Sequence, residues 1–284
     1  MPGGDCFHPL APGCVITRPT GIIMQPIITL TTDFGYQDHY VGVLKGVILR
    51  INPAATLVDI THAVPAHAIT HAAFLLASSY SFFPAGTVHL AVVDPGVGTS
   101  RRPIVVDAGS HCFVGPDNGI FTFIYRKLAT FTVYELSEPA FFLPVVSATF
   151  HGRDVFAPVA AHLSSGVPPF RLGQPIGDYC ILTIPEPHRT RNILRGTILY
   201  VDGFSNLITN ISARDLDMMG TPGQLRVRIR ATIIKGISAH YQAVNVGEAL
   251  AIVGSTDLLE ISIREGKAGQ ILDAHEGDDV IVEI

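Results

Sequence analysis

Residues 27–35, IITLTTDFG, decide the fold class. IITLTT is a short apolar run rich in β-branched residues that ends in an Asp-Phe-Gly turn, so we expect a strand there. Helical spacing follows at 40–51, and TLVDI at 56–60 predicts a second strand. Alanine- and leucine-rich residues 66–80 predict a buried helix that starts beside Pro65.

The predicted elements further along the chain indicate two domains. Strands at 87–93, 104–106 and 112–114 continue the alternation, which predicts an α/β fold with a central, mostly parallel sheet. Later β-rich runs, with no long helical pattern between most of them, predict an antiparallel β-barrel. We therefore expect an N-terminal extension at 1–25, an α/β domain at 26–177, a linker at 178–194 and a C-terminal β-barrel domain at 195–284.

Charged residues make up 15% of the 284-residue chain, against roughly a quarter in an average soluble domain. Residues 60–93 contain no Asp, Glu, Lys or Arg, but their longest purely apolar block is 72–77. Because a spanning helix needs about 20 apolar residues, we expect no membrane segment. A net charge of −5 argues against a nucleic-acid surface.

The cysteines bear on location and metal content. They are widely spaced and form no C-x-x-C pair, which predicts neither a zinc site nor a disulfide framework and fits the reducing cytoplasm. They are Cys6, Cys14, Cys112 and Cys180.

A few polar residues in this apolar chain are candidates for chemistry. Asp33 follows a strand, where a carboxylate binds ribose hydroxyls or caps a turn. Asp94 and Arg101 bound a glycine-rich loop that precedes a strand rather than a helix, so the loop is not a dinucleotide fingerprint; it is a site or a hairpin with an ion pair. His151 in TFHGRD orients water or bonds a loop carbonyl, and Asn206 pairs with an adenine edge or sits in a turn.

Other segments have weaker signals. Pro116-Asp117-Asn118-Gly119 reads first of all as a turn. Asp154 fits the N-terminal residue of a helix, with Arg153 as its exposed neighbour.

The motifs taken together resemble one family. They are TTDFGYQDHYVG, DITHAVP, FFPAGTVHLAVVDPGVGTSRRP, GPDNG, TFHGRDVFAPVAAHL, VDGFSNLITNI and GSTDLLEI, and they extend from residue 27 nearly to the C-terminus. In this order they resemble the S-adenosyl-L-methionine (SAM) hydrolases that form adenosine, or SAM hydroxide adenosyltransferases, which share a fold with fluorinase and chlorinase enzymes.

The resemblance implies attack of a water-derived hydroxide on C5′ of SAM, which releases adenosine and L-methionine without a metal or cofactor. It implies a homotrimer with the substrate between the N-terminal domain of one subunit and the C-terminal domain of the next. The implied catalytic residues are Asp94, Arg101 and His151. The implied substrate-binding residues are Asp33, Asp94, Asp202, Asn206, Ser255, Glu260 and Ile263.

Three alternatives remain open. A SAM-dependent 5′-halogenase resembles this chain less, because those relatives have Tyr at position 94, small residues at 101 and 151, and Ser at 152. The others are a SAM- or adenosine-binding protein without turnover and a hydrolase of another adenosyl compound. The chain also departs from the hydrolases, with Leu258 where an aromatic residue is usual and Ser205 where glycine is usual.

Overall fold

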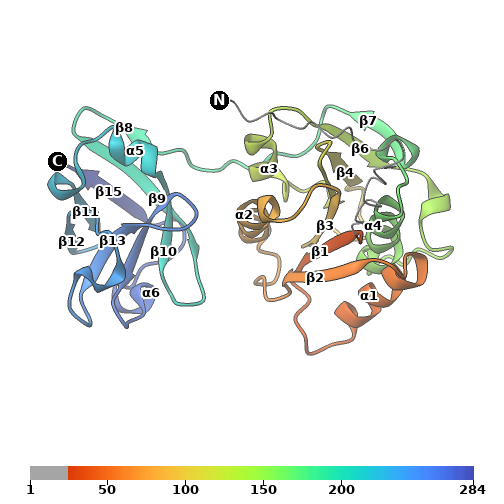
Figure 1. Cartoon of the computed structure of the whole chain (residues 1–284), viewed down its shortest axis with the longest axis horizontal. Helices are drawn as coiled ribbons and strands as arrows, with labels where there is room; N and C mark the ends of the chain where they lie inside the picture. Colours follow the sequence, from red (N-terminus) through yellow and green to blue (C-terminus); the bar gives the residue numbers. More distant parts are fainter. Residues whose placement is uncertain (1–24) are drawn as a thin grey trace, which may run out of the picture.

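The computed structural model describes residues 25–284, and the predicted extension, with Cys6 and Cys14, lies outside them apart from Gln25. Two bodies joined by one connecting segment are visible in Figure 1. The first holds a seven-stranded mixed sheet in the order β2-β1-β3-β5-β4-β6-β7. The pairs among β2, β1, β3 and β5 are parallel and the rest are antiparallel. The predicted α/β fold with a mostly parallel core is confirmed.

The strands of this first sheet are short. They are β1 (Ile27–Thr32), β2 (Thr56–Thr61), β3 (Thr87–Val92), β4 (Pro103–Asp107), β5 (His111–Pro116), β6 (Thr132–Leu136) and β7 (Gly173–Ile176). The helices are α1 (Tyr40–Ile51), α2 (Ile69–Ser79), α3 (Thr122–Lys127), a π-helical turn (Gly152–Phe156) and α4 (Ala157–Ser164).

The alternation of side chains on β3 explains the layers. Leu90 and Val92 pack with α1 and α4 in one core, whereas Ala91 and Val93 pack with α2 and α3 in another. Because successive side chains of a strand point to opposite faces, a strand whose residues are all buried needs covering layers on both sides. The low charge of residues 60–93 therefore reflects burial between two layers.

The predicted helix at 66–80 was wrong at its start. α2 begins at Ile69, because His67 has a left-handed backbone with φ of 67°. The backbone N–H of His67 instead donates to Asp33 Oδ2 at 3.0 Å. The segment after Pro65 is thus a turn that reaches the end of β1.

The second body is a nearly closed antiparallel barrel, as predicted. Its strand order is β12-β11-β15-β9-β10-β14-β13, and β8 pairs with β9. Ser238 bridges to Ile252 of β13 and closes much of the gap between β12 and β13. The strands are β8 (His188–Arg189), β9 (Ile193–Val201), β10 (Leu207–Ser212), β11 (Arg226–Ile229), β12 (Thr232–Lys235), β13 (Ala249–Val253), β14 (Leu258–Ile263) and β15 (Asp279–Glu283). The helices are α5 (Ala213–Asp217) and α6 (Ala268–Ile271).

Aromatic and charged contacts join the two bodies. Phe74 of α2 stacks on Tyr200 of β9 with ring centroids 5.2 Å apart. His71 of the same helix lies 3.6 Å from Glu276. No helix in the described part of the chain is long and apolar enough to cross a membrane.

Candidate active site

Two neighbouring parallel strands deliver the first site residues. Thr32 of β1 is in register with Val92 of β3, so Asp33 and Asp94 leave the sheet at the same edge. Ligands in open α/β sheets bind outside the carboxyl ends of the strands. The fold therefore gathers these two carboxylates where a ligand is expected.

Asp94 and Arg101 form a buried ion pair across the glycine-rich loop. Nε of Arg101 lies 2.9 and 3.0 Å from the two carboxylate oxygens, and Nη2 also donates to Oδ2. The side chains are 5% and 9% exposed. Such a two-point, desolvated pair fixes the orientation of the Asp94 carboxylate, unlike a surface ion pair.

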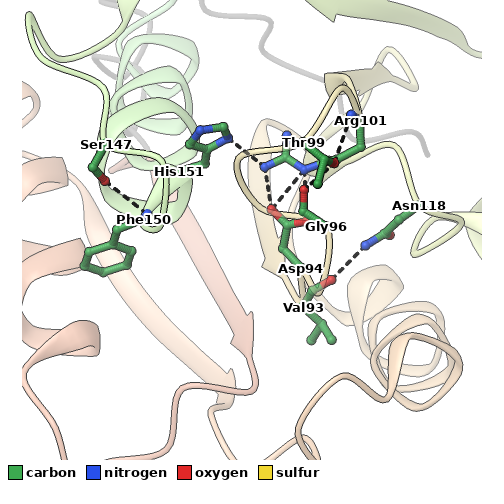
Figure 2. Close-up of polar contacts among 9 residues, drawn as sticks. All are labelled: Val93, Asp94, Gly96, Thr99, Arg101, Asn118, Ser147, Phe150 and His151. Atoms are coloured by element: carbon green, nitrogen blue, oxygen red, sulfur yellow. Dashed lines mark hydrogen bonds and ion pairs between the residues drawn. The ribbon is translucent and has the colours of Figure 1, made fainter.

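His151 completes this cluster, as Figure 2 shows. Nη2 of Arg101 donates to His151 Nδ1 at 2.8 Å, so Nδ1 acts as an acceptor and the neutral imidazole carries its proton on Nε2. Burial lowers the pKa of His151, and the Arg101 guanidinium lowers it further. His151 is therefore neutral near pH 7.

The same edge of the sheet holds a pocket of about 180 Å³. Its lining combines four residues that carry carboxylate or imidazole side chains with aromatic rings and small or apolar residues: Asp33, Phe34, His67, Val92, Asp94, Val97, Thr149, Phe150, His151 and Gly152. Phe34 and Phe150 meet edge to face at 5.8 Å. The structure thus brings together Asp33, Asp94 and His151 in one mostly apolar cavity.

The segment around His151 is held by a buried carboxylate. Asp154 is fully buried, accepts from the Ser147 backbone N–H at 2.8 Å and pairs with Arg153. The prediction that Asp154 lies at the N-terminal end of a helix fits its place in the first turn of the π-helical segment, but it gave no hint that the carboxylate fixes the loop before His151. His151 itself leads directly into the π-helical turn, a feature frequent at functional sites.

Asp202 and Asn206 lie in the turn between β9 and β10. Asp202 Oδ1 accepts from the backbone N–H groups of Phe204 and Asn206, and Oδ2 accepts from Asn206 Nδ2 at 3.0 Å. Asn206 keeps one amide N–H and its oxygen for a ligand. Ser205 has a φ of 68°, the left-handed region that glycine tolerates better.

Asn206 and Ile263 line a second pocket, on the barrel. It also contains Phe204 and Tyr241, which are 80% and 46% exposed and which the sequence analysis did not single out. The solvent exposure of these two rings is what marks them as candidate ligand contacts. Sequence spacing does not reveal it, because an exposed aromatic residue and a core aromatic residue can occupy the same place in a pattern. These two rings offer aromatic faces that Leu258 does not.

Glu260 is buried behind this second pocket. Its Oε1 accepts from the Tyr241 hydroxyl and from Ser262 Oγ, each at 2.7 Å. Burial and the bond to this carboxylate raise the pKa of Tyr241 to about 12. Ser255 lies apart, in the exposed turn before β14, whereas Ile263 ends that strand.

The two pockets share no lining residue. Asp33, Asp94 and His151 belong to one, and Asn206 and Ile263 to the other. Within residues 25–284, no group of three or more His, Cys, Asp or Glu side chains is arranged to hold a metal ion.

Comparison with known proteins identifies relatives over nearly the whole chain. Residues 28–173 match the SAM hydroxide adenosyltransferase N-terminal domain, and 196–281 match the C-terminal domain of that family. An (R)-S-adenosyl-L-methionine hydrolase of Salinispora arenicola is 35% identical, with 90% of this chain and 97% of that protein aligned. One from Thermus thermophilus is 36% identical, over 89% and 98%. A fluorinase of Actinoplanes is more distant, 28% identical over 72% and 78%.

Solved structures agree with these matches. An uncharacterized conserved protein from Thermotoga maritima superimposes with a TM-score of 0.86 at 38% identity, covering 90% of this chain and all of that one. A conserved hypothetical protein from Thermus thermophilus gives a TM-score of 0.75 at 33% identity, covering 91% and 100%.

Proposed function

The chain belongs to the SAM hydroxide adenosyltransferase family, and from this premise we propose that it hydrolyses SAM to adenosine and L-methionine, with Asp94, Arg101 and His151 as catalytic residues. The observation that carries this proposal is the Asp94–Arg101–His151 cluster, of which Asp94 and His151 line the pocket at the carboxyl edge of the sheet. The predicted hydrolase activity agrees with the names of the relatives.

Asp94 is suited to receive the proton of the attacking water. As the water oxygen bonds to C5′, the C5′–S bond breaks, its electron pair stays on methionine sulfur, and the water becomes acidic enough for a carboxylate to accept its proton. His151 Nδ1 already accepts from Arg101, so its Nε2–H donates and orients the water. The proton then passes from Asp94 to solvent.

The surroundings favour this reaction. Attack on a sulfonium cation ends with a neutral sulfur, so a dry site that does not over-solvate the cation helps. Phe34 and Phe150 line the pocket, and an aromatic ring attracts a cation to its π electrons. Asp33, whose Oδ2 accepts from His67, is the proposed ligand of the ribose hydroxyls.

A halogenase reaction fits this pocket poorly. The Asp94 carboxylate repels a halide. A Cβ added to Gly152 would lie 3.2 and 3.3 Å from the rings of Phe34 and Phe150, so a serine there would be crowded by both rings.

We propose that Asp202, Asn206, Ser255, Glu260 and Ile263 act from the C-terminal domain of a neighbouring subunit in a homotrimer. The separation of the two pockets within one chain supports this. Phe204 and Tyr241 then provide faces for the adenine ring.

We also propose a division into an α/β domain at 26–177, a linker at 178–194 and a barrel domain at 195–284, although β8 lies inside the proposed linker and pairs with the barrel. We propose a cytoplasmic location as well, which suits the free thiols of Cys112 and Cys180.

Incubation with SAM and chromatography of the products tests the function. We expect adenosine and methionine in equal amounts, and no 5′-halo-adenosine when chloride or fluoride is added. Asp94→Asn should lower kcat by roughly 10²–10⁴, the usual contribution of general acid–base catalysis.

Asp107→Asn is the matched control, because the Asp107 carboxylate accepts from Gly109 N in its own turn and lies outside the catalytic pocket, so the variant should keep wild-type kcat. Binding of SAM without any products, even at high enzyme concentration, would contradict hydrolysis and favour a binding protein.

A further inference from the structure

The turn at residues 116–119 contacts the backbone on one side of the catalytic loop. Asn118 Nδ2 donates to the carbonyl oxygen of Val93 at 2.8 Å, and Val93 directly precedes Asp94, as Figure 2 shows. The Asn118 oxygen accepts from the Ile120 N–H at 3.2 Å, which fixes the orientation of the amide.

Asp117 holds the other side of the same loop. Its backbone N–H donates to the carbonyl of Arg102 at 2.9 Å. Its Oδ2 accepts from Nε and Nη2 of Arg102 at 3.2 and 2.9 Å. Asp117 is 6% exposed, so these bonds are shielded from water.

The loop from 94 to 101 needs such support. It contains no helix or strand, and Gly96 and Gly98 give its backbone much conformational freedom in the unfolded chain. Its internal backbone hydrogen bonds are turn bonds, such as Thr99 N to Gly96 O, and the Asp94–Arg101 ion pair links its two ends to each other. The position of that pair relative to His151 and the pocket therefore depends on where the two ends of the loop are held.

We propose that Asp117 and Asn118 are positioning residues that clamp the two ends of the 94–101 loop and thereby keep Asp94 and Arg101 in catalytic register. Neither side chain lines the catalytic pocket, so they act through their neighbours. This role rests on the proposed function for its effect on turnover.

The clamp also fixes the segment that leaves the first sheet. Asp117 Oδ1 accepts from the Cys180 N–H at 2.7 Å, and Arg102 Nη1 donates to Asp178 at 2.8 Å. The start of the connection to the barrel and the base of the catalytic loop thus share one buried carboxylate.

Asn118→Ala tests the clamp, and Asn52→Ala is its matched control. Asn52 has the same bonding pattern elsewhere: its Nδ2 donates to Ser164 Oγ at 2.8 Å and its oxygen accepts from Ala54 N, two residues on. Both variants lose a comparable hydrogen bond and should lose comparable thermal stability. Only Asn118→Ala should lower kcat, by about tenfold or more, with KM changed less than about threefold, because misplacement of catalytic groups acts on the reaction step.

Trypsin gives a second readout that needs no turnover. Its site after Arg101 lies in the loop, while Pro103 blocks cleavage after Arg102. We expect mass spectrometry to detect cleavage after Arg101 about tenfold faster in Asn118→Ala than in Asn52→Ala, because local opening controls such cleavage. If Asn118→Ala does not fold, Asp117→Asn replaces it in both measurements, with the same expected effects. The asparagine keeps an oxygen that accepts from Cys180 N but loses the charge that pairs with Arg102.

The outcomes separate the two proposals. Wild-type kcat in Asn118→Ala, or cleavage no faster than in Asn52→Ala, overturns the clamp. A wild-type protein that forms no adenosine overturns the proposed function, and the cleavage rates then still decide whether Asp117 and Asn118 hold the loop.

Discussion

Arg101 connects the other two members of the proposed catalytic cluster. Its guanidinium donates to both oxygens of Asp94 and to Nδ1 of His151. A lysine could not reproduce this arrangement, because its ammonium lacks the planar fork of donors. The identity of this cation therefore determines the orientation of both the carboxylate and the imidazole.

We predict that kcat falls on the acid side with a midpoint below pH 6.5. Burial and the Arg101 guanidinium lower the pKa of His151, so the imidazole stays neutral at pH 6.5 and becomes protonated only in more acidic solution. Protonation places a proton on Nδ1, facing the Arg101 donor, and the hydrogen bond between them is lost. Measurement of kcat from pH 4.5 to 8 checks this.

His162→Gln is the control for that profile. Burial also lowers the pKa of His162, but this residue lies on α4 and does not line the catalytic pocket. It should leave the acid limb unchanged, and a midpoint at or above 6.5 in the wild type would contradict a neutral His151.

The sequence identified the charged members of the site because charge is rare around them. Asp94 ends the long uncharged stretch, Arg101 belongs to the first pair of adjacent basic residues in the chain, and His151 stands between Phe150 and Gly152. Asn118 was not identified, because Asp-Asn-Gly predicts a turn equally well whether or not its amide reaches another segment. Long-range side-chain bonds leave no periodic signal.

Elements were predictable where burial imposed a period. α1 was predicted at its observed bounds, and β1 and β3 to within one residue, since apolar runs between turn residues have few alternatives. The start of α2 was wrong because a tertiary bond from His67 to Asp33 outweighed the preference for Pro65 at a helix start.

The middle of β3 carries a histidine that should make stability fall in acid. The His89 side chain is completely buried (0% exposed). Its Nδ1 forms a hydrogen bond with Thr29 Oγ1 at 2.7 Å. Burial, with a smaller effect of His111, lowers its pKa to about 3. Below pH 6.5, His89 binds a proton in the unfolded chain but stays neutral in the folded chain. The contribution of His89 to the free energy of unfolding is therefore present above pH 6.5 and is lost between pH 6.5 and about 3.

We predict that His89 alone removes about 2 kcal/mol of unfolding free energy between pH 7 and pH 5. Urea unfolding at the two pH values should show a smaller difference for His89→Gln than for the wild type. His188→Gln, at an exposed position in β8, is the control and should keep the wild-type difference. An equal pH dependence in His89→Gln and wild type would contradict this account.

At the scale of the whole molecule, the main feature is the division of the proposed substrate-binding residues between two pockets. The α/β domain carries the carboxylates and His151, and the barrel carries Asn206 and two exposed aromatic rings. The sequence predicted both domains from composition and periodicity. The proposal that they meet across subunits rests on the family resemblance and on the separation of the two pockets, because no periodicity in a single chain encodes which copy supplies a residue.

A mixture of two inactive variants tests the shared site. Asp94→Ala disables the α/β half and Asn206→Ala the barrel half, and each homotrimer should be nearly inactive. In co-expressed, randomly mixed trimers, about a quarter of the sites combine an intact half from each variant, so activity should recover to about a quarter of wild type per site. Sites built within one chain would recover nothing, because every chain carries one defect. Mixing Asp94→Ala with Arg101→Ala, both in the α/β half, is the control that must stay inactive under either arrangement, so recovery confined to the first mixture would establish that neighbouring subunits complete each site.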